Sequence, residues 1–417
     1  MNSDRLPFSF SGTIPPSKSL LIRGLLLQLT EPAVTLPVLS RCSDVVAMQG
    51  ACAAFAAGQT RIHCGEAGLV LRLCLGYAAR RGGDFVLCGS RRLIERPHEP
   101  FLSVLRQLGA QVSICDDGAA PALRTRSLGF ADPGGRLSLL SGLSSQFASS
   151  LILNAWDLPF PLHILCEKEP ISEGYLDLSI DVAQRCGMQI ERQYEADKMI
   201  LIVPPRQRLV PAVLPCEADV SSAFAVAALA AVAGTCHIVN FPLHSLQPDH
   251  CFVDILQKMG VSLDLSTKGL VVQRAERLRA IEVDVGGAPD LTPVLSVLCA
   301  LAEGTSRLFG APHLRGKESD RIATTSALLQ VLGREHTPRE DGIEIVGRPL
   351  ADSDRSTLRQ FDAGSDHRLV MAAALARWAG FPVEIAGLSA VHKSFPEFLT
   401  IAGLADLAAD TLSKKDS

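Results

Sequence analysis

Several residue types and patterns are scarce or missing, and each absence disfavours a class of protein. Aromatic residues make up 5% of the 417 residues. No apolar run reaches the roughly 18 residues of a membrane span without glycine, proline or charge, so no span is expected. The N-terminus lacks a basic segment followed by an apolar one, so we expect a cytoplasmic protein. The net charge of −4 provides no global basic field, which disfavours nucleic acid as a partner.

Common cofactor and metal motifs are also missing. The sequence has no P-loop, no Rossmann fingerprint, no zinc motif and no evident Ser-His-Asp order. The 12 cysteines are scattered through apolar runs without a CxxC pair, which is typical of buried thiols in a reducing compartment. We therefore expect an enzyme that uses neither a cofactor nor a metal ion.

Repetition is the strongest organisational signal in what is present. Four segments share a helix that ends at a glycine and leads into a strand, and this glycine stands where a left-handed residue would stop the helix. They are Leu105–Val112, Ala183–Ile190, Leu256–Leu263 and Leu329–His336. A second pattern, an Ala/Leu-rich helix followed by a short turn and an alternating strand, recurs between them. Its members are Ala51–His63, Leu75–Cys88, Ala227–Val239, Val297–Phe309 and Ala373–Ile385.

These repeats predict about six α/β units, three in each half, with helices covering one face of small mixed sheets. The length favours two domains of about 200 residues each. A proline-rich stretch near Pro211–Glu217 breaks the periodicity and marks the join. In two-domain α/β proteins a ligand usually lies in the crevice between the domains.

The opening helix carries polar chemistry at its start. Lys18, Ser19 and Arg23 share one face at the beginning of the apolar segment Leu20–Leu29, which should be buried. A helix N-terminus with a Lys and a forked Arg can bind a phosphate or a carboxylate. A capped core helix with a solvated Lys and Arg is the alternative.

Cations recur at predicted helix entrances in both halves of the chain. They are Lys18, Arg23, Arg96, Lys317, Arg321, Arg368 and Lys393. Each could be a solvated neighbour of a helix cap, but seven together suggest a cleft for more than one phosphate or carboxylate. Asp290 and Glu318 stand among these cations and could act as proton acceptors. The pattern therefore favours a reaction between two anionic small molecules.

The chain resembles the enolpyruvyl transferases from Ile14 to Pro396. The resemblance is carried by an ordered set of motifs: Pro16-Ser-Lys-Ser19, Glu95-Arg-Pro97, Ser144-Ser-Gln146, Lys317-Glu-Ser-Asp-Arg321, Asp366-His-Arg368 and Lys393-Ser-Phe-Pro396. It implies an α/β (α+β) fold of two domains, each with three βαβαββ repeats around buried helices. The first domain would comprise residues 15–216 and the second residues 1–14 and 217–417, with the active site in the cleft between them.

The resemblance is strongest to the members that act on shikimate 3-phosphate. It implies transfer of the enolpyruvyl group of phosphoenolpyruvate to the 5-hydroxyl of that acceptor, with release of phosphate, by a monomer. The catalytic residues it implies are Lys18, Asp290, Glu318 and Lys393. The implied shikimate 3-phosphate ligands are Ser19, Arg23, Ser144, Ser145, Ser172, Tyr175, Asp290, His313 and Lys317. The implied phosphoenolpyruvate ligands are Lys18, Gly68, Arg96, Gln146, Arg321, Arg368 and Lys393.

Some positions depart from the family pattern. Gly65-Glu66-Ala67-Gly68-Leu69 replaces the usual Gly-Asn-Ala-Gly-Thr, Leu21 and Ile22 replace Ser-Asn, and His313 replaces an Asn. These changes leave open a divergent relative that uses a different cyclic or anionic acceptor in a specialised pathway. An anion-sensing binding protein is a further alternative. A UDP-N-acetylglucosamine enolpyruvyl transferase is disfavoured because its loop Cys has no counterpart in residues 89–96.

Overall fold

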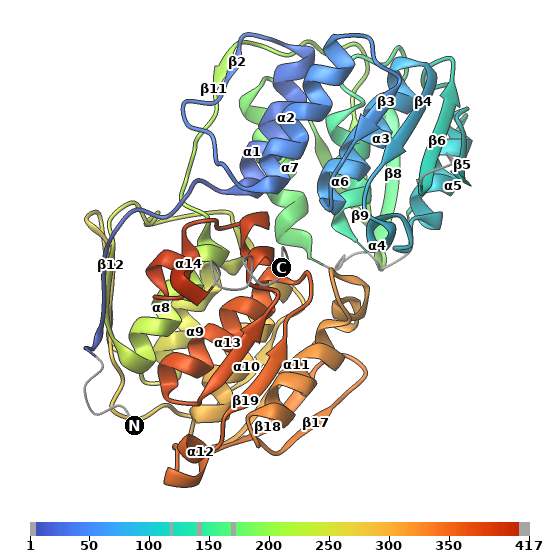
Figure 1. Ribbon diagram of the computed structural model, residues 1–417. Helices are drawn as coiled ribbons and strands as arrows, with labels where there is room; N and C mark the ends of the chain where they lie inside the picture. The colour runs from blue at the N-terminus through green and yellow to red at the C-terminus, as the bar shows by residue number, and fades with distance from the viewer. Residues whose placement is uncertain (1–5, 117–119, 140–143, 168–171, 408–417) are drawn as a thin grey trace. The chain divides into compact units, whose positions relative to one another are not determined.

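The computed structural model describes residues 6–116, 120–139, 144–167 and 172–407 (Figure 1). The chain divides into two compact units. Unit 1 comprises Met1–Pro15 and Glu217–Ser417, and unit 2 comprises Pro16–Cys216. Each unit contains one large hydrophobic cluster of its own. Helices and small mixed sheets alternate in both units, which confirms the predicted α/β class.

Unit 2 contains two complete βαβαββ repeats. The first consists of β3 (Arg61–His63), α3 (Gly68–Arg81), β4 (Gly83–Cys88), α4 (Arg91–Ile94), α5 (Glu99–Gln107), β5 (Gln111–Asp116) and β6 (Pro121–Ser127). The second consists of β7 (Leu137–Ser138), α6 (Ser145–Leu153), β8 (Leu162–Glu167), α7 (Glu173–Arg185), β9 (Glu191–Glu195) and β10 (Lys198–Val203). The first two strands of each repeat are parallel, and the closing hairpin pairs antiparallel, as in the order β3-β4-β6-β5.

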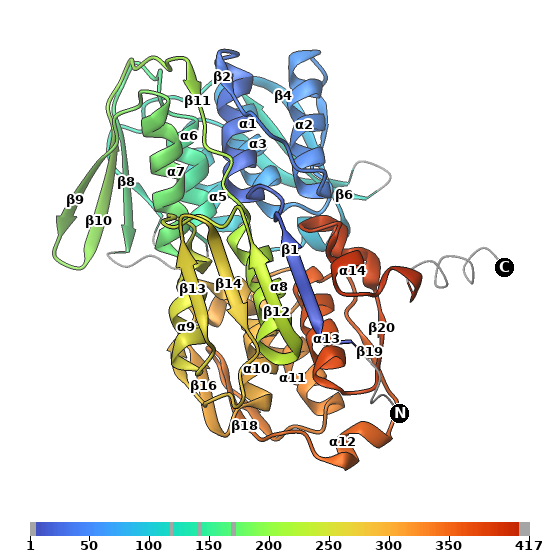
Figure 2. The same cartoon turned by 90° about the vertical axis from the view of Figure 1, so that its left-hand side faces the viewer.

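Unit 1 contains two complete repeats of the same design. The first is β1 (Phe8–Gly12), α8 (Val220–Ala233), β12 (Gly234–Ile238), η1 (Pro248–Cys251), α9 (Phe252–Lys258), β13 (Leu263–Ser266) and β14 (Gly269–Gln273). The second is β15 (Glu282–Asp284), η2 (Pro289–Leu291), α10 (Thr292–Leu301), β16 (Gly304–Phe309), η3 (Pro312–Gly316), α11 (Arg321–Val331), β17 (His336–Pro338) and β18 (Ile343–Gly347). Figure 2 shows the sheet β1-β12-β14-β13, whose first strand is supplied by the N-terminal segment.

The four glycine-ended helices predicted from the sequence are confirmed, and each precedes the hairpin of a complete repeat. Gly109, Gly187, Gly260 and Gly333 all have positive φ, between 66° and 87°. Each helix closes with the same pair of backbone bonds, as in Gly109 N to Arg106 O and Ala110 N to Leu105 O. This is the Schellman ending, in which a glycine avoids the steric cost that a side chain would meet.

The third repeat of each unit has two strands in the described residues, rather than the four that a full βαβαββ repeat requires. In unit 2 it consists of β11 (Ala212–Val213), α1 (Lys18–Thr30), β2 (Val34–Thr35) and α2 (Ser43–Ala56). In unit 1 it consists of β19 (Arg359–Asp362), α13 (His367–Ala379), β20 (Val383–Ala386), η4 (Leu388–Lys393) and α14 (Phe398–Ile401), with α12 (Asp352–Ser356) leading into it. The reason in unit 2 is chain length, because only residues 57–60 separate α2 from β3, too few to form a hairpin.

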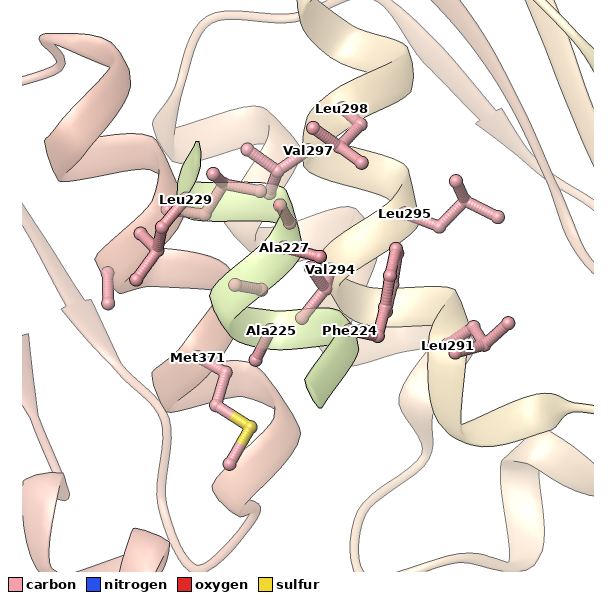
Figure 3. Packing of buried hydrophobic residues seen from close by; sticks show 14 of the residues in the cluster. Phe224, Ala225, Ala227, Leu229, Leu291, Val294, Leu295, Val297, Leu298 and Met371 are labelled. Atoms are coloured by element: carbon pink, nitrogen blue, oxygen red, sulfur yellow. The ribbon is translucent and has the colours of Figure 1, made fainter. Parts of the chain in front are cut away.

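The first helix of each repeat lies at the centre of its unit. In unit 1 the central helices α8, α10 and α13 contact one another, and in unit 2 α1, α3 and α6 do the same. Figure 3 shows Phe224 and Leu229 of α8 beside Val294 and Val297 of α10, with Met371 of α13 close by. These helices are apolar nearly all round, which is the pattern expected of buried helices. Across the described ranges, no helix is long and apolar enough to cross a membrane.

Candidate active site

In unit 1, side chains from the N-terminal ends of α11 and α13 bond Asp290, which lies just before α10. Asp290 is the middle residue of η2, and α10 begins two residues later at Thr292. Its Oδ1 accepts a hydrogen bond from Arg321 Nη1 at 2.7 Å, and its Oδ2 accepts one from Arg368 Nη2 at 3.1 Å. One predicted proton acceptor is thus held between two of the predicted cations.

Glu318 occupies a similar position on the other side of Arg321. Its Oε2 accepts from Arg321 Nη2 at 3.1 Å, and its Oε1 lies 3.2 Å from Lys393 Nζ at the end of η4. The carboxylates of Asp290 and Glu318 keep 20% and 14% of their surface exposed, whereas the Arg321 and Arg368 side chains keep 1% and 2%. The two carboxylates therefore remain accessible to a ligand while the arginines are set behind them.

Burial and charge act in opposite directions on these arginines. Burial would lower the pKa of Arg321, but the carboxylates of Asp366, Asp290 and Glu318 raise it well above its usual value. Burial likewise opposes the charge of Arg368, and Asp290, Asp219 and Asp249 more than offset it, so its pKa is also raised. Both guanidinium groups stay cationic, because a charge in a buried site persists when opposite charges surround it.

His313 and Lys317 flank the same cluster. His313 lies in η3 and is 9% exposed. Its pKa is lowered to about 3, first by burial and then by the cations Lys317 and Arg321, against the opposing effect of Asp290. The imidazole is therefore neutral at physiological pH and can offer one donor and one acceptor nitrogen.

In unit 2, Gly68 lies in a pocket of polar side chains at the start of α3. A Cβ atom built on Gly68 would stand 2.6 Å from Arg96 Nη1, 3.5 Å from Arg72 Nη1 and 3.6 Å from Gln146 Oε1. Arg72 also donates to Gln146 Oε1, which joins α3 to the start of α6. A side chain at this position would therefore displace the Arg96 guanidinium.

Lys18, the first residue of α1, forms an ion pair in the same unit. Its Nζ lies 2.9 Å from Asp44 Oδ2 near the start of α2, and the side chains keep 15% and 8% of their surface exposed. The pair holds the ammonium group at the opening of α1, although the two residues are far apart in sequence.

Arg23 is turned inward rather than toward solvent. It is 1% exposed, and its three nitrogens donate to Ser179 Oγ (2.7 Å), Ser19 O (2.8 Å) and Tyr175 O (2.9 Å). Burial lowers the pKa of Arg23 to about 10. These bonds tie α1 to α7, so Arg23 fixes the backbone at two other predicted ligands, Ser19 and Tyr175.

The remaining predicted ligands of unit 2 lie at the starts of α6 and α7. Ser144 caps α6 by accepting from Gln146 N at 3.3 Å, and Ser145 is buried beside it. Ser172 is the N-cap of α7 and has a left-handed backbone with φ of 59°. Residues 141–143, directly before Ser144, lie outside the described residues.

The sequence-based prediction missed three residues that hold these side chains in place. They are Asp366, which bonds Arg321; Asp44, which pairs with Lys18; and Arg72, which bonds Gln146. Asp366 and Asp44 are acidic residues at or just inside a helix start, where carboxylates are commonly found for local reasons. Their position at a helix start could have marked these two residues as helix caps, but it could not identify their partners, which are distant in the sequence.

In the described part of the chain, no group of three or more His, Cys, Asp or Glu side chains could hold a metal ion.

Comparison with solved structures first defines the class of protein. The fold matches EPSP synthase from Acinetobacter baumannii with a TM-score of 0.69 at 23% identity, covering 96% of both chains. It also matches the enolpyruvyl transferase NikO from Streptomyces tendae with a TM-score of 0.72 at 14% identity, covering 96% of this chain and 95% of that one. At these identities the matches establish the fold, which is that of the enolpyruvyl transferases.

Sequence comparison then gives the family. The family model described as EPSP synthase (3-phosphoshikimate 1-carboxyvinyltransferase) matches residues 33–401. A 3-phosphoshikimate 1-carboxyvinyltransferase from Methanoculleus marisnigri is 33% identical over 356 residues, covering 85% of this chain and 81% of the relative. One from Halobacterium salinarum is 34% identical over 359 residues, covering 84% and 80%. The chain belongs to the EPSP synthase family and is a transferase, as its motifs predicted.

Proposed function

We propose that this protein transfers the enolpyruvyl group of phosphoenolpyruvate to the 5-hydroxyl of shikimate 3-phosphate and releases phosphate. Relatives with this enzyme name cover more than four fifths of the chain at 33–34% identity. That similarity favours shikimate 3-phosphate over the other acceptors that the sequence left open. The observation that carries the proposal is the arrangement of Asp290 and Glu318, two partly exposed carboxylates held on one arginine.

The reaction needs three proton transfers, and these two carboxylates can serve them. The 5-hydroxyl oxygen forms a bond to C2 of phosphoenolpyruvate, and Asp290 accepts the hydroxyl proton. Glu318 delivers a proton to the methylene carbon, and a tetrahedral intermediate results. Glu318 then takes a proton back from the new methyl group while the C2–phosphate oxygen bond breaks. The products are the enol ether and inorganic phosphate.

The cations would bind the anionic groups of the two substrates. We assign phosphoenolpyruvate to Lys18, Gly68, Arg96, Gln146, Arg321, Arg368 and Lys393. We assign shikimate 3-phosphate to Ser19, Arg23, Ser144, Ser145, Ser172, Tyr175, Asp290, His313 and Lys317. Within the second set, Arg23 would act by holding Ser19 and Tyr175, because its nitrogens are engaged inside unit 2. Lys18 and Lys393 would stabilise charge that develops during the reaction.

These assignments require the two units to act together. We propose that they correspond to the predicted domains, residues 15–216 and residues 1–14 with 217–417, and that each supplies side chains to the reaction. A monomeric state and a cytoplasmic location stay predictions.

The test is phosphate release from phosphoenolpyruvate by the purified protein, with and without shikimate 3-phosphate. The proposal predicts release only when the acceptor is present, with one phosphate per enol ether formed. Phosphate release that requires a different hydroxyl acceptor would instead favour the alternative of a divergent relative with another substrate. Binding of phosphoenolpyruvate with no release for any acceptor would favour the binding-protein alternative.

A further inference from the structure

Asp366 lies between Arg321 and Arg368, the two buried arginines of the unit 1 cation cluster, although it is not among the predicted ligands. It is the N-cap of α13 and is 1% exposed. Its Oδ2 accepts from Arg321 Nε at 2.9 Å and from Ser319 Oγ at 2.9 Å. Its Oδ1 accepts from the backbone N of Arg368 at 3.0 Å and from Arg321 Nη2 at 3.3 Å. One buried carboxylate therefore contacts both arginines of the cluster.

The contact with Arg321 determines which way that side chain points. A guanidinium group is planar and rigid, so fixing its Nε and Nη2 edge also fixes the direction of Nη1. Nη1 is the atom that donates to Asp290, and Nη2 also donates to Glu318. The geometry of both predicted proton acceptors thus depends on the edge that Asp366 holds.

The contact with Arg368 acts through the backbone. Asp366 caps the first turn of α13, which sets the position from which the Arg368 side chain reaches Asp290 Oδ2 at 3.1 Å. The Asp366 carboxylate has no exposed surface, whereas Asp290 and Glu318 are partly exposed. A ligand would therefore meet those two carboxylates first, and Asp366 would act on it only through other side chains.

We propose that Asp366 is a positioning residue, which orients Arg321 and the start of α13 so that two guanidinium groups converge on one anionic ligand. The identity of that ligand as phosphoenolpyruvate rests on the proposed function. A purely structural role is the competing explanation, since a buried capped carboxylate also stabilises a helix.

The test compares two matched substitutions in unit 1. Asp366→Asn keeps an oxygen that can cap α13 but replaces an acceptor by an NH₂ group facing the Arg321 donors. Asp354→Asn is the control, because Asp354 is also buried and accepts from Arg348 (2.7 Å), Arg334 (3.2 Å) and the backbone N of Ala351 (2.9 Å). Both variants lose a buried ionic contact, but only Asp366 contacts the candidate site.

The first readout is the Kd for phosphoenolpyruvate, measured by calorimetry, which needs no turnover. Losing a charge-assisted contact behind Arg321 should raise Kd in Asp366→Asn by about 10-fold or more. In Asp354→Asn, Kd should stay within about twofold of the wild-type value, even if the Tm of this variant falls by as much as the Tm of Asp366→Asn. In steady-state kinetics, Asp366→Asn should raise KM for phosphoenolpyruvate and leave KM for shikimate 3-phosphate within about twofold.

Two results would overturn the inference: wild-type affinity in folded Asp366→Asn, or an equal loss of affinity in both variants. If Asp366→Asn does not fold, Ser319→Ala removes one hydroxyl contact to Asp366 and should raise Kd by about threefold. An unchanged Kd in that variant would then count against the proposal. Wild-type protein that binds phosphoenolpyruvate but releases no phosphate would contradict the proposed function and leave this comparison valid.

Discussion

The two units hold their cations by different means. In unit 1, Arg321 and Arg368 are surrounded by carboxylates, and both guanidinium groups donate to Asp290. In unit 2, Arg72 donates to the neutral amide of Gln146, and Arg23 donates to a hydroxyl and to backbone carbonyls. Among the predicted ligands of unit 2, Lys18 is paired with a carboxylate, that of Asp44, as the unit 1 arginines are.

This difference suggests that the two units contribute differently to proton transfer and to anion binding. Carboxylates beside the unit 1 arginines supply proton acceptors and fix the guanidinium groups, but they also offset part of the positive charge. Neutral groups contribute to orienting Arg72 and Arg23 in unit 2. We therefore expect substitution of the unit 1 proton acceptors to lower turnover, and substitution at Gly68 in unit 2 to weaken binding.

The largest effect should come from Asp290→Asn in unit 1. Removing the proton acceptor while keeping its shape should lower kcat by about 100-fold to 10,000-fold. KM for each substrate should change by less than about threefold, since the amide still occupies the site. Steady-state phosphate release measures both constants. A variant with wild-type kcat would end the assignment of Asp290 as the base.

Gly68→Ala should produce the opposite pattern in unit 2. Its new Cβ would stand 2.6 Å from Arg96 Nη1, so the guanidinium must move. Displacing a charge-assisted contact should raise KM for phosphoenolpyruvate by about 10-fold, with a smaller change in kcat. Gly50→Ala in α2 is the control, because a Cβ there meets nothing within 4 Å. Equal kinetics for the two variants would show that Arg96 does not contact the ligand.

A buried histidine in unit 2 should make stability depend on pH. Burial, together with the charge of Arg72, lowers the pKa of His98 to about 4. Between pH 7 and pH 4 the unfolded chain therefore binds a proton at this histidine that the folded chain does not bind. Stability therefore falls as pH decreases, and His98→Gln should reduce the loss between pH 7 and pH 5 by about 2 kcal/mol. Urea unfolding at pH 7 and at pH 5 measures the free energy of unfolding of both proteins. An unaltered pH slope would mean that His98 becomes protonated in the native state.

The smallest effect should come from Glu66→Asn, which restores the usual family residue. Glu66 lies in the turn before α3 and is exposed, whereas Gly68 two residues later is buried. A solvated charge is strongly screened, so Kd for phosphoenolpyruvate should tighten by less than about twofold. Calorimetry at low and high salt measures the change. A tightening of about 10-fold would instead place the carboxylate beside the ligand.

Local sequence was sufficient to predict much of the backbone. The four helix ends at Gly109, Gly187, Gly260 and Gly333 were predictable because a left-handed residue favours glycine wherever it occurs. The burial of α1 was predictable from its apolar residues on every side. These features depend on neighbours within a few positions. The sequence thus determined the repeats, the central helices and the helix ends where the cations stand.

Tertiary structure decided which side chains meet. Asp366 and Arg321 are 45 residues apart, and Arg72 and Gln146 are 74 apart. No local pattern encodes such a pair, because helix N-termini converge only when separate repeats pack around common central helices. The same packing decided that Arg23 turns inward. Local sterics therefore fixed the elements, and burial of their shared apolar faces fixed the partners of each charge.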